Sequence, residues 1–244
     1  TQPYRDPSPL STADIDLFEA LATLSVEGTG YRVIKTNPDF VYDPKTVIVG
    51  VWSDTLSTTF GIPGYTLELW NPYAFAGVEM ENPAEFFKKP DQKLIRTLIA
   101  AFAKDPEMVS DWTAVEHPQL GTVEVGGIDY MRTVRNPPEA LLPAEVARGA
   151  VVADRMLAST PQLRVSLVPT VDGAITIVDA VVENLGFLPT TGSEHAEKLE
   201  LVSPIRLDVQ LGEGLQLVDG EVTQTVGHLD GWGSLQVGAS RHGI

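Results

Sequence analysis

The spacing of hydrophobic residues predicts a helix near the start of the chain. Apolar side chains recur every three or four residues after Ser11, and Gly28 and Gly30 follow the last of them. Ser11 is a favourable N-cap, and Asp14 three residues later completes a short variant of the capping box. We therefore expect a helix that begins directly after Ser11 and ends before the two glycines.

Two more segments have helical spacing. One follows Asp91 and is limited by Pro106. Its expected apolar face consists of Leu94, Ile95, Leu98 and Phe102. The other begins at Pro143, a residue suited to the first helical position, and extends to about Ala158. The face that it is expected to bury consists of Val146, Ala150, Ala153 and Leu157.

In the C-terminal part the apolar positions alternate with a period of two. This alternation covers residues 163–167, 175–181, 205–211 and 222–226. Asp172-Gly173 and Asp219-Gly220 have the composition of turns between such strands. The run predicts a small antiparallel β-sandwich. Nearer the N-terminus, residues 47–49 form a short apolar run, which predicts one more strand before Gly50.

Residues 61–70 have the pattern of a buried strand that carries one carboxylate. Tyr65, Leu67 and Leu69 would point to one side and Glu68 to the other. An ionised carboxylate in such a strand costs several kcal/mol unless it is paired or functional. Glu68 is therefore either a structural residue at a strand end, solvated or paired with an Arg, or part of an active site.

The sequence around Glu68 resembles the catalytic-glutamate strand of the zinc carboxypeptidases of the carboxypeptidase A type. The shared pattern is Gly61-Ile62 followed by aromatic-Thr-hydrophobic-Glu-Leu, and Trp70 stands where bacterial members often have Trp. Other segments are similar, in the same order, to one bacterial branch of that family. They are residues 14–18, 30–31, 39–40, 112, 117–121, 123–127, 135–138 and 184–190. The resemblance covers about residues 1–230, and the shared order is more specific than any one motif.

The resemblance implies a fold and a reaction. Residues 1–135 would be the C-terminal part of a carboxypeptidase-like α/β catalytic domain, 136–160 a linking helix and 161–244 an antiparallel β-sandwich-like domain. The parent enzyme would hydrolyse C-terminal residues from peptide or protein substrates by zinc-activated water, with Glu68 as general base and then general acid. Tyr42 lies nearest to the position of the family's substrate-binding tyrosine, and a core or loop aromatic is its alternative role.

The zinc ligands that the resemblance implies are not found in this sequence. Such sites use His-x-x-Glu and a later His, located before the catalytic glutamate. All four histidines follow Glu68, and none has Glu three residues later: His117, His195, His228 and His242. We therefore expect the ligands upstream of Thr1, and the fragment alone to be inactive without catalytic zinc. His117 is predicted to hold a turn, and His195 to lie on a solvated loop.

Composition narrows the classes of partner. The formal charge of −16 opposes binding to nucleic acid or anionic lipid, which requires clustered Lys and Arg. No apolar run approaches the length of about 18 residues that a membrane span needs. The absence of Cys excludes disulfides and a thiolate nucleophile. The resemblance suggests a secreted or periplasmic protein. A non-catalytic module that binds peptides or cell surfaces, and an inactive homologue, are the alternative functions.

Overall fold

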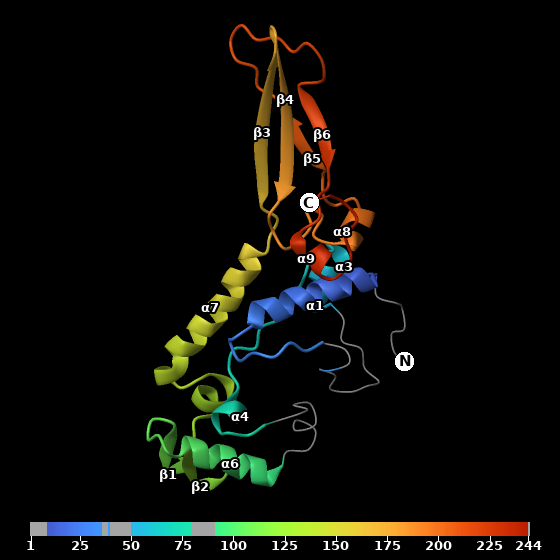
Figure 1. Cartoon of the computed structure of the whole chain (residues 1–244). Helices are drawn as coiled ribbons and strands as arrows, with labels where there is room; N and C mark the ends of the chain where they lie inside the picture. Colours follow the sequence, from blue (N-terminus) through green and yellow to red (C-terminus); the bar gives the residue numbers. More distant parts are fainter. Residues whose placement is uncertain (1–8, 36–38, 40–49, 80–90, 244) are drawn as a thin grey trace. The chain divides into compact units, whose positions relative to one another are not determined.

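The computed structural model describes residues 9–35, 39, 50–79 and 91–243 as a mixture of helices and small antiparallel sheets (Figure 1). The α-helices are α1 (Thr12–Val26), α3 (Trp52–Thr59), α4 (Pro72–Phe75), α6 (Gln92–Phe102), α7 (Leu142–Ala158), α8 (Glu194–Lys198) and α9 (Trp232–Gln236). The strands are β1 (Val109–His117), β2 (Gly121–Ile128), β3 (Leu163–Asp172), β4 (Ile175–Asn184), β5 (Ile205–Asp208) and β6 (Thr223–Gly227). A π-helical turn, Met131–Arg135, and a 3₁₀ turn, Glu139–Leu141, precede α7. None of the described helices is long and apolar enough to cross a bilayer.

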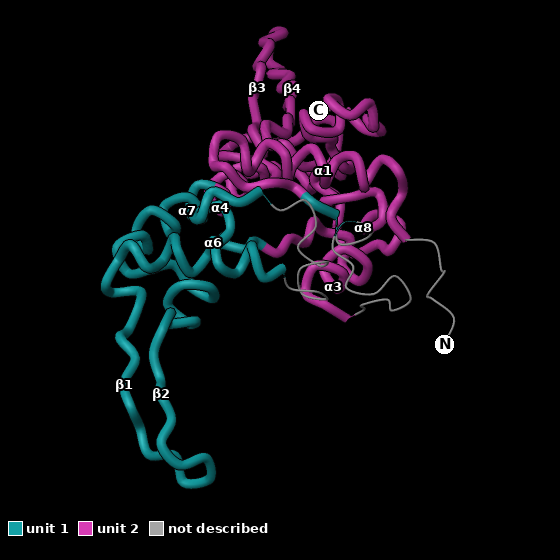
Figure 2. Tube along the Cα trace, turned by 90° about the horizontal axis from the view of Figure 1, so that it is seen from below, with its two compact units in different colours: residues 1–4, 34–47, 67–151 teal, residues 5–33, 48–66, 152–244 magenta. Residues whose placement is uncertain are grey.

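The chain divides into two compact units (Figure 2). Unit 1 comprises residues 1–4, 34–47 and 67–151, and unit 2 comprises residues 5–33, 48–66 and 152–244. Each unit is therefore assembled from segments that are distant in sequence. This differs from the three consecutive segments that the sequence predicts, 1–135, 136–160 and 161–244, which remain a prediction.

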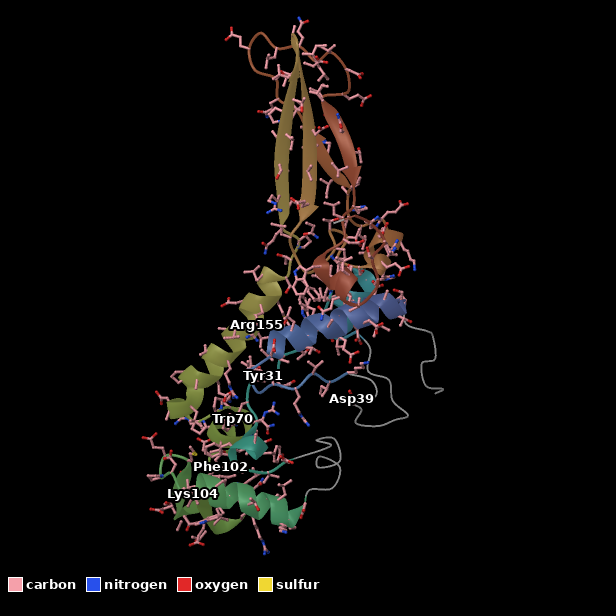
Figure 3. The ribbon with its side chains drawn as sticks, viewed as in Figure 1. Tyr31, Asp39, Trp70, Phe102, Lys104 and Arg155 are labelled. Carbon is pink, nitrogen blue, oxygen red and sulfur yellow. The ribbon has the colours of Figure 1, made fainter. Side chains whose placement is uncertain are left out.

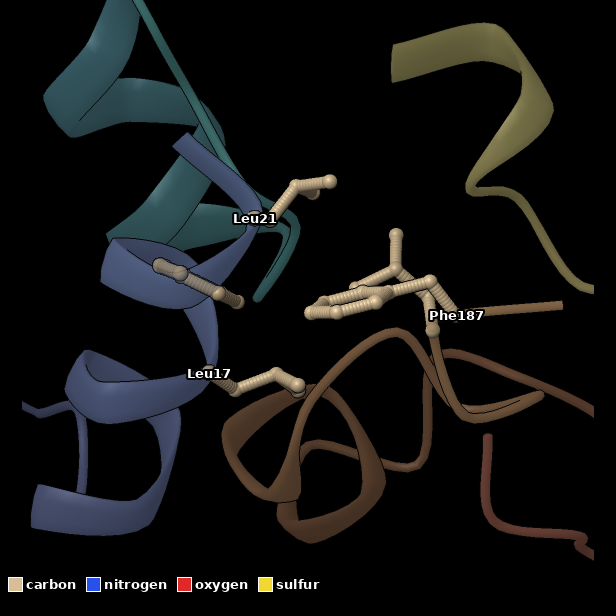
Figure 4. Packing of buried hydrophobic residues seen from close by; sticks show 5 residues of the cluster. Leu17, Leu21 and Phe187 are labelled. Carbon is tan, nitrogen blue, oxygen red and sulfur yellow. The ribbon is translucent and has the colours of Figure 1, made fainter. Parts of the chain in front are cut away.

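The core of unit 2 forms where α1 packs against residues 187–188. Leu17, Phe18 and Leu21 of α1 are buried together with Phe187 and Leu188 (Figure 4). The predicted start of α1 is confirmed, because the Ser11 side chain accepts the Asp14 N–H and the Asp14 side chain accepts the Ser11 N–H. At the other end of α1, Arg155 donates to the backbone carbonyls of Ser25 and Glu27, which satisfies orphan acceptors at a helix C-terminus.

One buried side chain joins three parts of unit 2. The Asn184 amide oxygen accepts the backbone N–H groups of Gln162 and Gly186, each at 3.0 Å. Its amide nitrogen donates to the carbonyls of Leu188, at 2.8 Å, and Asp230, at 3.1 Å. All four hydrogen-bonding sites of the amide are thereby used. The motif 184–190 thus fixes the base of β4 against the segment before α9.

The core of unit 1 is built on α6. The predicted helix after Asp91 is confirmed, with the Asp91 side chain accepting the Lys93 N–H at 2.8 Å. Leu98, Phe102 and Met108 are buried together, and Trp70 packs against them. Trp70 and Phe102 are both labelled in Figure 3. Phe75 connects the two rings, stacking on Phe102 with centroids 5.4 Å apart and lying 5.6 Å from Trp70.

The strands form three separate two-stranded antiparallel sheets: β1–β2, β3–β4 and β5–β6. The four predicted C-terminal strand segments and the turn at Asp172-Gly173 are confirmed, and Gly173 adopts a φ of 62° there. Among the described residues these sheets do not pair further, so the predicted β-sandwich is not confirmed. The expected strand at residues 47–49 lies outside the described residues.

One prediction of burial was wrong. In α7 the predicted inner face is exposed, with Val146 56% and Leu157 70% accessible, whereas Glu145 and Val152 are buried. The apolar spacing located the helix correctly but not the side of it that is buried. Helix α3 was not predicted at all, because its Ser- and Thr-rich sequence has no apolar stripe.

Candidate catalytic segment around Glu68

The turn before Glu68 is held by close backbone contacts within unit 2. Gly61 has a φ of 63°, and a Cβ there would collide with the backbone of Ala196. The Ser193 hydroxyl donates to the Gly61 carbonyl. A Cβ at Gly64 would collide with the carbonyl of Ser53. Both glycines are therefore required by the packing of the turn within unit 2.

Tyr65, also in unit 2, anchors the beginning of the segment. Its hydroxyl donates to the carbonyl of Phe18 at 2.7 Å, and its ring packs against the α1 core. Burial raises the pKa of the Tyr65 phenol well above its ordinary value of 10.0, because the ionised form would lose its hydration. Tyr65 is thus a neutral structural donor at physiological pH.

The other end of the segment is anchored in unit 1. Gly149 of α7 lies against Leu67 and Leu69, and a Cβ at position 149 would come within 2.9 Å of Leu69 Cδ2. Trp70 donates its indole N–H to the carbonyl of Thr133 at 2.7 Å. Leu67 and Leu69 therefore contact Gly149, although Leu69 stays 46% exposed, and Trp70 makes a partly buried hydrogen bond.

Glu68 itself is exposed, and it has no hydrogen bond or ion pair with any residue that the structure describes. Residues 63–70 form neither a helix nor a strand, so the prediction of a buried strand was wrong. Of the two structural alternatives considered for this carboxylate, an ion pair with a described Arg is not present, whereas the exposure of Glu68 fits a solvated residue.

The structure places no other predicted site residue beside Glu68 among the residues that it describes. Tyr42 lies outside the described residues. In the described part of the chain, no group of three or more His, Cys, Asp or Glu side chains could hold a metal ion. The described residues therefore do not fit a zinc site.

The histidines have structural positions. His117 Nδ1 accepts the backbone N–H groups of Gln119 and Leu120, each at 3.2 Å, so its predicted role in the turn between β1 and β2 is confirmed. The prediction for His195 was wrong. It lies buried on α8, with Nε2 2.8 Å from the carbonyl of Thr58. Distant segments of unit 2 cover it, which no local pattern in the sequence indicates.

A charged cluster near the C-terminus was not singled out by the sequence. Glu197 on α8 pairs with Arg241 at 2.9 Å and with His242 at 3.3 Å. Asp230 accepts the N–H groups of Arg241 and His242. The adjoining cavity has about 20 Å³ of space, room for one water molecule. The cluster therefore holds the C-terminal segment in place.

The comparisons with known proteins concern the C-terminal part of the chain. The model of a family described as a domain of unknown function, DUF8731, matches residues 162–242. These residues begin just before β3 and extend past α9. No curated protein and no solved structure is similar enough to the chain to count as a match.

Proposed function

We propose that Glu68 is the catalytic carboxylate of a zinc carboxypeptidase and that this chain is the C-terminal part of that enzyme. In this proposal residues 1–135 belong to a carboxypeptidase-like mixed sheet with helices. Residues 136–160 link it to a β-sandwich-like domain, 161–244. The substrates are the C-termini of peptides or proteins outside the cytoplasm, in the medium or the periplasm.

The observation that carries the proposal is the contrast between Glu68 and its neighbours. Leu67 and Leu69 contact Gly149, and Trp70 is hydrogen-bonded to Thr133, so the residues on both sides of Glu68 have partners in unit 1. The carboxylate is exposed and is not used by any described partner. A catalytic group needs this combination, because it must be held in position and yet be free to bind a reactant.

The chemistry assigned to Glu68 is proton transfer. Its carboxylate would accept a proton from the water that attacks the scissile carbonyl and would then deliver that proton to the leaving amine. In carboxypeptidases of this type zinc activates the attacking water. The described residues do not fit the metal, so the proposal assigns zinc to residues outside the described part of the chain.

The test is Glu68→Gln in the full-length protein. We expect the rate of C-terminal residue release from a peptide to fall by about 100-fold or more, as when a general base is removed. Glu79→Gln, at another exposed carboxylate in unit 1, is the matched control and should keep its rate. If the unsubstituted protein releases no C-terminal residue, or if both variants keep their rate, the catalytic assignment is wrong.

Metal analysis gives an independent test. The purified 244-residue chain should bind no stoichiometric zinc, since the described residues lack a ligand set. The source DNA should encode His-x-x-Glu and a later His upstream of Thr1. Stoichiometric zinc in the purified chain that is lost in Glu68→Gln would contradict this division of the active site.

A further inference from the structure

The β1–β2 hairpin, which lies within unit 1 (Figure 2), carries an exposed tryptophan beside two glycines. Trp112 is 67% exposed on β1. The strand register shifts between Ser110 and Thr113, and a Cβ at Gly126 would come within 2.7 Å of Trp112 Cα. A Cβ at Gly127 would lie 3.7 Å from Cζ2 of the indole. No β2 side chain therefore covers the ring at these two positions.

One face of the hairpin combines this tryptophan with carboxylates. From Thr113 to His117 the register is regular, and residues directly opposite each other share a face. Trp112 precedes Thr113, so alternation along β1 places it on the side of Ala114. We call this the tryptophan face: Trp112, Ala114, Glu116, Thr122, Glu124 and Gly126, all of them exposed. The opposite face carries Thr113, Val115, His117, Gly121, Val123 and Val125.

The tryptophan face is negatively charged. Residues 105–131 contain no Lys or Arg. Glu116 accepts the Thr122 hydroxyl at 2.5 Å, and Glu124 has no hydrogen bond or ion pair with any described residue. The hairpin carries a third exposed carboxylate at Asp111. A partner that contacts the ring therefore meets carboxylates whose charge no Lys or Arg of the hairpin balances.

Charge and chemistry narrow the partners of this face. An apolar partner would bury Glu116 and Glu124 without a counter-charge, which is strongly unfavourable. A nucleic acid, an anionic membrane or the same face of a second copy would be repelled by these carboxylates. No group of three or more His, Cys, Asp or Glu side chains among the described residues could hold a metal ion. An organic cation fits, because an aromatic ring attracts it and the carboxylates pair with it.

We infer that the tryptophan face binds an Arg side chain of a polypeptide partner. A guanidinium is planar, so it stacks on an indole, and its fork of N–H donors matches a carboxylate. Glu124 pairs with Ala114 and lies diagonally across from Trp112, within reach of a long side chain. Lys fits less well, because its ammonium is compact and strongly hydrated. Arg binding at this face does not require Glu68 to be catalytic.

The probe is a peptide in which Arg alternates with Gly, acetylated and amidated so that its ends are uncharged. Without a free C-terminal carboxylate, its binding does not depend on peptidase activity. In an NMR titration of the full 244-residue chain, the indole N–H signal of Trp112 should shift saturably, and less at high salt. The indole signal of Trp70, which donates to the Thr133 carbonyl, should not move. A citrulline peptide, with the shape of Arg but no charge, should not bind, and a Lys peptide should bind more weakly.

Two matched pairs of variants test the placement. Trp112→Ala should weaken binding of the Arg peptide about fourfold, the effect of one exposed cation–π contact. Trp52→Ala, at 69% exposure on α3, should leave the affinity unchanged. Glu124→Gln should weaken binding about threefold, the effect of one exposed ion pair. Glu139→Gln, at another exposed carboxylate of unit 1, should not.

Several results would overturn the inference. They are the absence of a saturable shift, equal binding of the citrulline or Lys peptide, shifts confined to residues outside the hairpin, and equal affinities within both pairs of variants. Binding of a neutral oligosaccharide such as cellohexaose at Trp112, without binding of the Arg peptide, would assign the ring to a sugar instead. The citrulline comparison uses the unsubstituted chain, so it decides the question even if Trp112→Ala does not fold.

Discussion

Replacing Asp14 with Ala should destabilise unit 2 far more than removing a helix cap usually does. Asp14 is only 2% exposed, and its carboxylate accepts three backbone N–H groups. The N–H of Ser11 belongs to its own helix start, whereas those of Glu194, at 2.7 Å, and His195, at 3.1 Å, begin α8. One carboxylate therefore holds the starts of two helices whose sequences are far apart.

The magnitude follows from those three bonds. A hydrogen bond to a charged group contributes about 1.5–3 kcal/mol, and contributions within one network do not simply add. Because water has little access to the buried N–H groups left behind, we expect Asp14→Ala to cost about 3 kcal/mol of unfolding free energy. Asp16→Ala removes the same charge from the exposed side of α1 and should cost less than about 0.5 kcal/mol.

Urea unfolding of the two variants gives the difference in free energy. Hydrogen exchange gives its location, because the amides of Glu194 and His195 should lose protection in Asp14→Ala but not in Asp16→Ala. Equal unfolding midpoints for the two variants would refute the argument. So would unchanged protection of both amides, since the predicted loss depends on those bonds.

Two further perturbations address the rest of unit 2. Asn184→Ala leaves four backbone groups without their partner and should cost about 3 kcal/mol in urea unfolding. Gln162→Ala should cost much less, because the hydrogen bond that its side chain donates to the Ala158 carbonyl is exposed. Tyr65 is stabilising below its unfolded pKa of 10.0, and that contribution falls as the pH rises further, because only the unfolded phenol ionises readily. Tyr65→Phe should therefore cost about 1 kcal/mol of unfolding free energy at neutral pH. Above about pH 10 its melting temperature should fall less steeply with pH than that of the parent chain. An equally steep fall in both proteins would contradict this.

The sequence predicted the elements whose signals are local. Ser11 and Asp91 cap helices because a side-chain oxygen two or three residues before an N–H can accept it whatever surrounds the helix. The turn at Gly173 and the strands on both sides of it were likewise predictable. An Asp-Gly pair between two segments of alternating apolar residues favours a β-hairpin, because glycine readily adopts the positive φ of the turn. These elements can be predicted without knowing how they pack in the folded protein.

The predictions that failed concern which side of an element is buried, and this depends on the segment that packs against it. In α7 the apolar stripe at Val146 and Leu157 is exposed, and the helix turns its Gly149 side toward Leu69. A glycine allows close approach, but its position in a sequence does not reveal the partner. The same holds for His195, whose burial depends on contacts with Thr58 and Asp14. Ser193 as an N-cap was the local signal that could have located α8.

At Glu68 the local sequence pattern and the tertiary packing have to be considered together. The predicted alternation survives around it, since Leu67 and Leu69 share one contact at Gly149, but the buried strand does not. An exposed carboxylate without a described partner contributes little to folding, so Glu68→Gln should leave the unfolding free energy within about 0.5 kcal/mol of the parent. A large loss of peptidase rate in a variant of unchanged stability could then be assigned to chemistry. For a carboxylate in a structural ion pair, the same experiment would confuse lost catalysis with lost structure.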